Sequence, residues 1–125
     1  MQQEQSSSAP VVLVVENDVL LRLVTASNLR DAGFEVIEAA DSAEAVLVLD
    51  SMPVDALFSD IDMPRRMDGL ALAQWVHQRR LDTRIILTSG GERALGAAEE
   101  YASFLPKPYA VADVEHLLRS VFPCP

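Results

Sequence analysis

Acidic and amide side chains follow two strongly apolar runs of the sequence. The first run, VVLVV, leads directly into Glu16 and Asn17, and the second, ALFS, ends on Asp60 with Asp62 close behind. Carboxylate and amide oxygens suit a hard dication such as Mg²⁺, which takes a few protein oxygens and keeps several waters. If the two runs are neighbouring parallel strands, one edge of the sheet gathers these oxygens.

Two later runs end in side chains of a different kind. The run IILTS ends on Thr88 and Ser89, and the run FLPKP places Lys107 directly before Pro108. An ammonium and a hydroxyl beside carboxylates suit a phosphoryl group, whose charge they can stabilise. An aspartate in that company can act as a nucleophile and form an acyl phosphate. These residue types therefore predict phosphoryl chemistry at the shared edge.

Each of these residues alone has an ordinary structural explanation. Asp18 precedes a helical stripe, and we interpret it as a helix N-cap. Asp62 before Met-Pro fits a turn, the Ser-Gly-Gly at Ser89 fits a flexible loop, and Lys107 fits a solvated charge. Their joint placement at four strand ends is what favours a functional site over these separate explanations.

The elements that would position these residues alternate along the chain. Apolar runs alternate with segments of helical periodicity, which is typical of a parallel sheet covered on both faces. In such doubly wound sheets, ligands bind beyond the carboxyl ends of the strands. We expect the strands at residues 11–15, 34–39, 55–59, 84–89 and 103–106.

The segments between the expected strands carry apolar stripes of helical spacing. Gly33 fits the C-terminal stop of the first helix, and Asp41 opens a capping-box-like start, DSAE, for the second. Further stripes follow the third and fifth strands. We also expect a helix in GERALGAAEEYA, residues 91–102, although this segment is short and contains a glycine.

The composition is that of one soluble domain. The chain has 125 residues, a net charge of −9 and a pI near 4.5, which argues against nucleic-acid and anionic membrane partners. No stretch approaches the roughly 20 apolar residues of a membrane span. We expect a disordered tail at 1–10, one domain at 11–122 and a short tail at 123–125. The only cysteine, Cys124, cannot form an internal disulfide, which is compatible with the cytoplasm.

In combination and order, these motifs resemble the receiver domain of bacterial two-component response regulators. The matching pieces lie between about Pro10 and Phe122 and are VVLVVENDVLLR, DALFSDIDMP, MDGLALA, IILTSG and FLPKPY. The resemblance implies a flavodoxin-like (βα)₅ fold, a doubly wound five-stranded parallel sheet in three layers. It also implies that a partner histidine kinase donates a phosphoryl group to an aspartate.

The resemblance gives a role to each residue of the expected phosphoryl site. Asp60 matches the phosphoacceptor, and Ser89 matches the switch hydroxyl that binds a phosphoryl oxygen after activation. If the alignment with the family is shifted by one residue, Thr88 instead of Ser89 matches the switch hydroxyl. Lys107 matches the phosphate-binding lysine, which precedes a cis proline in this family. Phe104 falls where the family has a switch aromatic whose rotamer reports activation.

The same resemblance implies a Mg²⁺ site made by Glu16, Asn17, Asp60 and the backbone carbonyl of Asp62. At the position of Asn17 the family usually has an aspartate that binds the metal directly. An amide oxygen can bind Mg²⁺ but brings no charge, and losing one close carboxylate costs on the order of a few kcal/mol at most. We therefore expect weaker Mg²⁺ binding and slower phosphorylation than with an aspartate at this position.

The leading hypothesis is a stand-alone, cytoplasmic receiver that accepts a phosphoryl group on Asp60 from a histidine kinase or histidine phosphotransfer protein. It is not expected to be an enzyme beyond its own phosphorylation and dephosphorylation, and it would signal to an unidentified protein target. Two loops depart from the common pattern: MPRRMDG is one residue longer, and the stretch between Ser89 and Phe104 is several residues shorter. Both border the surface that changes on activation, so they affect partner choice.

Two alternatives stay open on the sequence alone. Asn17 supports a receiver-like interaction module that works without phosphorylation. A phosphatase of the haloacid-dehalogenase type also forms an aspartyl phosphate. It typically needs a DxD-type motif after the first strand and a larger chain, whereas here the candidate nucleophile follows the third strand.

Overall fold

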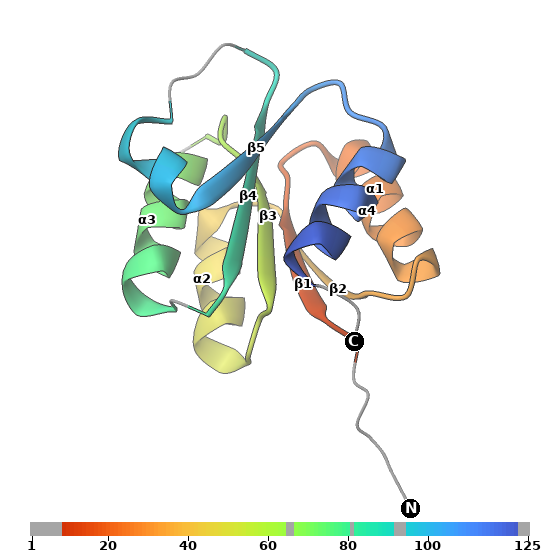
Figure 1. The fold of residues 1–125 in the computed structure, drawn as a ribbon. Coiled ribbons are helices and arrows are strands. Elements are labelled where there is room, and N and C mark those ends of the chain that lie inside the picture. The colour runs from red at the N-terminus through yellow and green to blue at the C-terminus, as the bar shows by residue number, and fades with distance from the viewer. Residues whose placement is uncertain (1–8, 65–66, 81, 92–94, 123–125) are drawn as a thin grey trace, which may run out of the picture.

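The chain folds around one five-stranded parallel sheet. The computed structural model describes residues 9–64, 67–80, 82–91 and 95–122. The strand order is β2-β1-β3-β4-β5, so the chain winds both ways from β1, as the alternation of apolar runs predicts (Figure 1). The strands are β1 Val11–Val15, β2 Glu35–Ala39, β3 Ala56–Asp60, β4 Arg84–Ser89 and β5 Ala102–Pro106.

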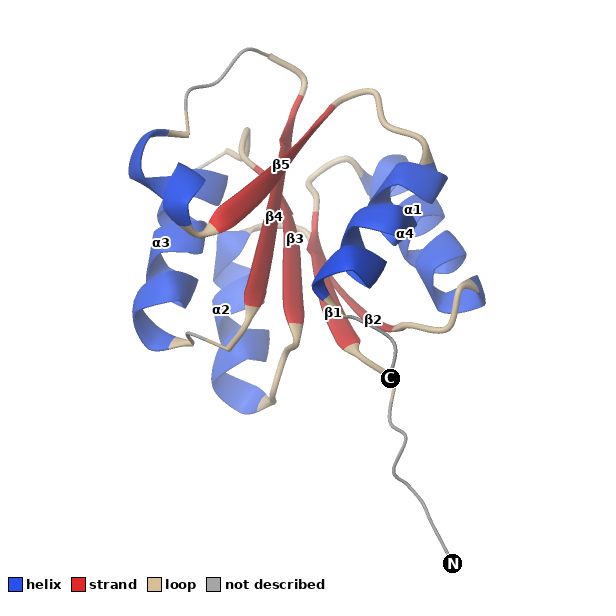
Figure 2. Ribbon diagram, viewed as in Figure 1, coloured by secondary structure: helices blue, strands red, loops and turns tan. Residues whose placement is uncertain are grey.

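Four α-helices cover the two faces of the sheet. They are α1 Val19–Asp31, α2 Ser42–Ser51, α3 Gly69–Arg79 and α4 Val111–Val121. Helices α1 and α4 lie on one face and α2 and α3 on the other, which gives three layers (Figure 2). No helix in the described part of the chain is long and apolar enough to cross a bilayer.

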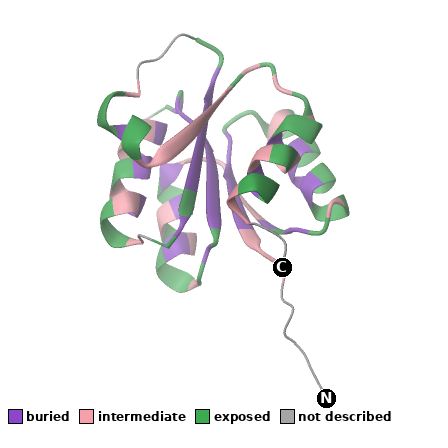
Figure 3. Cartoon of the chain, viewed as in Figure 1, coloured by how far each residue is buried: buried purple, intermediate pink, exposed green. Residues whose placement is uncertain are grey.

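The core lies in two layers, one on each side of the sheet. Because side chains alternate along a strand, Leu57 and Leu87 pack toward α2 and α3, whereas Phe58 and Ile86 pack toward α1 and α4. All five residues of β3 are buried, as expected for a central strand covered on both faces (Figure 3). The buried centre fixes the positions of the strand ends, where the candidate site residues stand.

The helix ends form as the sequence predicts. The Asp18 carboxylate accepts a hydrogen bond of 3.0 Å from the Leu21 amide at the start of α1, which confirms its interpretation as an N-cap. The Asp41 carboxylate accepts in the same way from the Glu44 amide. Helix α1 ends before Gly33, whose φ of 104° lies in the left-handed region that glycine adopts at little cost.

The segment between β4 and β5, where the sequence predicts a helix, contains no α-helix in its described part. Residues 92–94 lie outside the described residues, and the remainder forms only a short 3₁₀ helix, Gly96–Glu100. Gly96 has a φ of 60°, which is incompatible with the interior of an α-helix. The 3₁₀ helix begins at that glycine, and only Tyr101 separates its end from β5. In its described part, the fourth crossover therefore carries a 3₁₀ helix and no α-helix.

The two predicted tails fall almost entirely outside the described residues, as does Cys124. The described chain begins at Ala9, and the Pro10 carbonyl already accepts a hydrogen bond of 3.0 Å from the Glu35 amide. Pro10 is thus attached to the start of β2.

Candidate functional site

The register of the sheet brings four strand ends to one edge. Val15 pairs with Ser59, Asp60 pairs with Thr88, and Ser89 pairs with Pro106. Side chains that directly follow β1 and β5, or that end β3 and β4, therefore meet at the carboxyl edge of the sheet. Phosphoryl and metal ligands bind at this edge in doubly wound folds.

Lys107 joins two buried carboxylates at this edge. Its Nζ lies 2.8 Å from Oε1 of Glu16 and 3.3 Å from Oδ2 of Asp60. Glu16 is 4% exposed and Asp60 5%, so both carboxylates are largely withdrawn from water. Lys107 is the only lysine of the chain, and its bond to Pro108 is cis, as expected. The structure thus brings together three of the residues singled out by the sequence.

Burial and charge shift the pKa values of this cluster. Loss of solvent raises the pKa of Asp60 above its ordinary 3.8, and the Glu16 carboxylate raises it further. The Asp62 amide and the Lys107 ammonium offset part of that rise. Burial lowers the pKa of Lys107, but its bond and attraction to Glu16, and then to Asp60, raise it overall. A firmly protonated ammonium therefore faces the Asp60 carboxylate.

Hydrogen bonds that the sequence did not predict hold Glu16 in place. The Glu16 carboxylate also accepts from the Asp18 amide at 3.0 Å, and the Glu16 carbonyl accepts from Nη1 of Arg22 at 2.9 Å. Arg22 is held in turn by Glu38, whose carboxylate lies 3.3 Å from its Nε. No local pattern reveals this support, because Glu38 comes from β2 and Arg22 from α1.

The oxygen atoms near Asp60 fit a hard cation only in part. In the described part of the chain, no three His, Cys, Asp or Glu side chains are grouped so as to hold a metal ion. Glu16 and Asp60 supply two carboxylates, and Asn17, which is exposed, follows Glu16 directly. Two carboxylates, one amide and water form a donor set that Mg²⁺ accepts. The set carries one charge fewer than it would with an aspartate at Asn17.

The two hydroxyls at the end of β4 have different surroundings. Oγ of Ser89 donates to Oδ2 of Asp62 at 2.5 Å and accepts from the Gly91 amide at 3.2 Å. Thr88 is 1% exposed, and its Oγ1 has no hydrogen-bond partner among the described residues. The Ser89 hydroxyl, and not the Thr88 hydroxyl, therefore bonds to the loop that follows Asp60.

Two aromatic residues of the β5 region lie on opposite faces of the sheet. Phe104 is half-buried and packs against the core layer that contains Leu87, on the α2 and α3 side. Tyr109, which the sequence analysis did not select, packs edge-on against Phe58 with ring centroids 5.5 Å apart. Its hydroxyl lies 3.1 Å from that of Thr25. Tyr109 thus anchors the segment that follows Lys107 to α1.

Gly69 allows helix α3 to approach β3 closely. A Cβ at this position would lie 2.2 Å from the Asp60 carbonyl oxygen and 2.6 Å from the Ile61 Cα. The Gly69 amide donates to the Ile61 carbonyl at 2.9 Å. The close backbone contact requires glycine, which the sequence analysis did not single out at this position.

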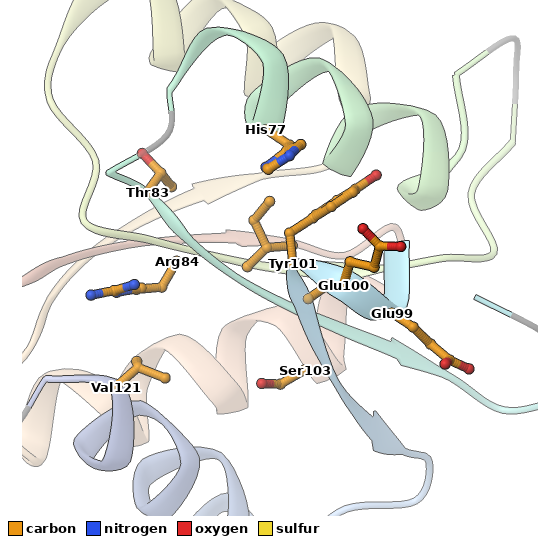
Figure 4. Close-up of a pocket in the computed structure, with 10 residues that line it drawn as sticks. His77, Thr83, Arg84, Glu99, Glu100, Tyr101, Ser103 and Val121 are labelled. Atoms are coloured by element: carbon orange, nitrogen blue, oxygen red, sulfur yellow. The ribbon is translucent and has the colours of Figure 1, made fainter. Parts of the chain in front are cut away.

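A separate hollow of about 490 Å³ lies at the opposite end of the sheet. Figure 4 shows it at the amino ends of β4 and β5, where His77 of α3 stacks on Tyr101 with centroids 3.9 Å apart. None of the residues that line it belongs to the cluster around Asp60. It is lined by His77, Thr83, Arg84, Ile85, Glu99, Glu100, Tyr101, Ala102, Ser103 and Val121.

Known sequences resemble this chain over most of its length. The chain is 33% identical over 107 residues to the transcriptional regulatory protein PdtaR of Mycobacterium tuberculosis, which covers 82% of the chain and 52% of PdtaR. The chain therefore spans about half the length of that relative. It is 31% identical over 118 residues to a probable chemotaxis protein CheY of Rhizobium etli, which covers 89% of the chain and 91% of that protein.

Solved structures resemble the fold as well. The chemotaxis protein CheY4 of Vibrio cholerae superposes with a TM-score of 0.81 at 27% identity, covering 90% of this chain and 98% of CheY4. The receiver domain of the hybrid histidine kinase CckA superposes with a TM-score of 0.75 at 30% identity, covering 89% and 97%. A family model, described as response regulator receiver domain, matches residues 12–119. The chain belongs to the family of response regulator receiver domains.

Proposed function

We propose that this receiver accepts a phosphoryl group on Asp60 and signals through the resulting change of its surface. The observation that carries the proposal is the Lys107 ammonium, which lies 3.3 Å from the Asp60 carboxylate and is held there by Glu16. A fixed positive charge beside an acceptor oxygen stabilises the charge of a phosphoryl group in transfer. Membership of the receiver family is consistent with this role.

In the proposed transfer, Asp60 is the only residue of this protein that forms a covalent bond to the phosphoryl group. An Asp60 oxygen forms a bond to phosphorus as the P–N bond of a donor phosphohistidine breaks, and the departing imidazole nitrogen keeps the electron pair. Lys107 stabilises the phosphoryl oxygens, and Glu16 keeps the ammonium in position. The Asp62 amide, 3.1 Å from Oδ1, orients the carboxylate.

Mg²⁺ is the proposed cofactor, with Glu16, Asn17, Asp60 and the Asp62 carbonyl as its protein ligands. When bound, it would supply further positive charge to the phosphoryl oxygens. One solved relative of the fold, the response regulator TrrA of Thermotoga maritima, is described as a complex with Mg²⁺ and BeF. Asn17 is the reason to expect weaker binding here.

The proposed phosphoryl donor is a histidine kinase or a histidine phosphotransfer protein. An apolar patch on α1 beside the site supports docking of a protein: Val19, Leu20, Leu23 and Val24 are each exposed by 44% to 71%. Such contiguous apolar exposure is typical of a protein interface. A hollow lined by Leu21, Gly90, Lys107, Pro108 and Tyr109 connects this helix to the site.

Ser89 and Phe104 are the proposed switch residues. The Ser89 hydroxyl bonds to Asp62 in the loop after Asp60, and Phe104 packs against the core layer on the α2 and α3 side. Movement of the Ser89 hydroxyl toward a phosphoryl group would leave space for Phe104 and shift an existing equilibrium. The protein target that reads this change stays unidentified.

Labelling with acetyl phosphate and Mg²⁺, followed by intact-mass spectrometry, tests the proposal. The wild type should gain one phosphoryl group, and Asp60→Asn should gain none. Asp50→Asn, which changes an exposed aspartate on α2, is the matched control and should label like the wild type. If the wild type stays unlabelled even with a kinase as donor, the phosphorylation-independent interaction module becomes the better interpretation.

A further inference from the structure

The segment that carries Lys107 is attached to the rest of the molecule on both sides of that residue. At its start, the Lys107 amide donates to the Ser89 carbonyl of β4 at 3.0 Å. Two residues later, the Tyr109 ring packs edge-on against Phe58 of β3, and its hydroxyl lies 3.1 Å from that of Thr25. Thr25 belongs to α1 and is 1% exposed. The position of the Lys107 segment therefore depends on a contact with the first helix of the chain.

The two hydroxyls meet at an apolar core layer. This layer, on the α1 and α4 side of the sheet, includes Ala26, Leu29 and Phe58, and Tyr109 packs against it. A buried hydroxyl gains little net stability from a hydrogen bond, because it gives up its bonds to water. Valine and phenylalanine would fill nearly the same space without that cost. Buried polar pairs of this kind instead fix one arrangement of the groups that they join.

The Tyr109 hydroxyl also lies close to the charged groups of the candidate site. Burial raises the pKa of Tyr109 above its ordinary 10.0, and the hydrogen bond to Thr25 offsets part of that rise. The charges of Glu16, Lys107 and Asp60 act on the same hydroxyl. The hydroxyl therefore stays protonated at neutral pH and remains available as a partner for Thr25.

We infer that Tyr109 is a positioning residue for Lys107 and acts through the hydrogen bond of its hydroxyl to Thr25. This inference rests on the proposed function, in which Lys107 stabilises the phosphoryl oxygens. With the bond made, the segment between β5 and α4 is fixed, and the ammonium is held close to Asp60. Without it, the segment gains freedom although the ring still packs on Phe58. The bond thus adds precision to the site and little stability to the fold.

The test is the rate of labelling by acetyl phosphate and Mg²⁺ in Tyr109→Phe, which keeps the ring and removes the hydroxyl. Labelling should slow by about tenfold, as expected for loss of precise placement at a reacting centre. Urea unfolding should change little, because Thr25 lies in a helix and its hydroxyl can bond to a carbonyl of the preceding turn. In the Lys107→Met background, the same change should slow labelling no further, because Tyr109 acts through the ammonium.

Matched variants separate the bond from the general loss of a hydroxyl. Thr25→Val removes the other partner and should slow labelling to a similar degree, whereas Thr25→Ser keeps the hydroxyl and should label nearly like the wild type. Thr25→Val combined with Tyr109→Phe should be no slower than either change alone, and about as stable as the wild type. Tyr101→Phe makes the same chemical change at the opposite end of the sheet and should keep the wild-type rate.

A second measurement needs no phosphoryl donor. Lys107 is the only lysine, so NMR of lysine-labelled protein reports on this side chain alone. Its two Hε protons should have separate chemical shifts in the wild type, where the ammonium is fixed, and should merge in Tyr109→Phe. Separate shifts in that variant, a wild-type labelling rate, or an equal slowing in the Lys107→Met background overturns the inference and leaves the proposed function intact. A wild type that is never labelled overturns the proposed function, and the NMR comparison then decides the positioning of Lys107 by itself.

Discussion

The two ends of the sheet are built by different means. At the carboxyl end, Glu16, Asp60 and Lys107 directly follow or end paired strands, and their contacts follow from the strand register. At the amino end of β4 and β5, the hollow is lined by residues of α3, the 3₁₀ helix Gly96–Glu100 and α4 as well as the strands. The first arrangement depends on hydrogen bonds of the backbone, and the second on side-chain packing.

The two ends of the sheet also differ in how closely their residues follow the family pattern. The carboxyl end keeps the ammonium and the carboxylates in one buried cluster, although Asn17 replaces a usual aspartate. The amino end carries the shortened fourth crossover, and its acidic residues Glu99 and Glu100 are exposed. We therefore expect substitutions at the carboxyl end to change chemistry, and substitutions at the amino end to change stability alone.

Gly69→Ala should have the largest effect on the carboxyl end. The new Cβ would lie 2.2 Å from the Asp60 carbonyl oxygen, so α3 or β3 must move. We expect a loss of stability of at least about 3 kcal/mol, the range of severe overpacking, together with loss of labelling. Urea unfolding measures the first quantity. Gly90→Ala, where a Cβ meets nothing within 4 Å, should change stability little; similar losses in both would contradict the prediction.

Lys107→Met should come next and should affect labelling more than folding. It removes the ammonium that lies between Glu16 and Asp60 and leaves two buried carboxylates facing each other. We expect labelling by acetyl phosphate to slow by about 100-fold, as for removal of one electrostatic group at a transfer site. Lys107→Arg, which keeps the charge, should label faster than Lys107→Met. Equal rates for the two variants would show that the charge is unimportant.

The sequence predicts the carboxyl end well because strand ends are local features. The strands at 11–15 and 84–89 are found at the expected residues, and Asp18 caps α1 as expected. The pairing of Arg22 with Glu38 and the bond between Ser89 and Asp62 could not be predicted, because each joins elements distant in sequence. Of the helix expected at 91–102, the described part forms only the 3₁₀ helix Gly96–Glu100, which begins at a glycine with a positive φ that an α-helix does not accept.

Asn17→Asp should strengthen the proposed metal site. The change restores a carboxylate directly after Glu16 and beside Asp60, so Mg²⁺ affinity should rise about tenfold, with faster labelling. Isothermal titration calorimetry measures the affinity. Asn28→Asp, which changes an exposed asparagine on α1, is the matched control and should leave the affinity nearly unchanged. Equal affinities for wild type and Asn17→Asp would mean that residue 17 is not a ligand.

The pKa of Lys107 offers a direct measurement at the carboxyl end, because the chain has no other lysine. NMR of lysine-labelled protein should give a pKa above the ordinary 10.5, and Glu16→Gln should lower it. With a raised pKa in the folded state, the ion pair stabilises the fold fully below pH 10.5, and this stabilisation is lost as the pH rises through the folded pKa. A pKa at or below 10.5 would contradict the ion pairs.

His77→Ala tests the amino end and should have the smallest effect. The His77 ring stacks on Tyr101 at 3.9 Å between centroids with an interplanar angle of 5°, and such pairs contribute about 1 kcal/mol. Urea unfolding should therefore show a loss of about that size. Labelling of Asp60 should keep its wild-type rate, because the stack and the acidic cluster lie at opposite ends of β4 and β5. A slowed rate would mean that the two ends are coupled through these strands, and that side-chain packing at the shortened crossover also influences the phosphoryl site.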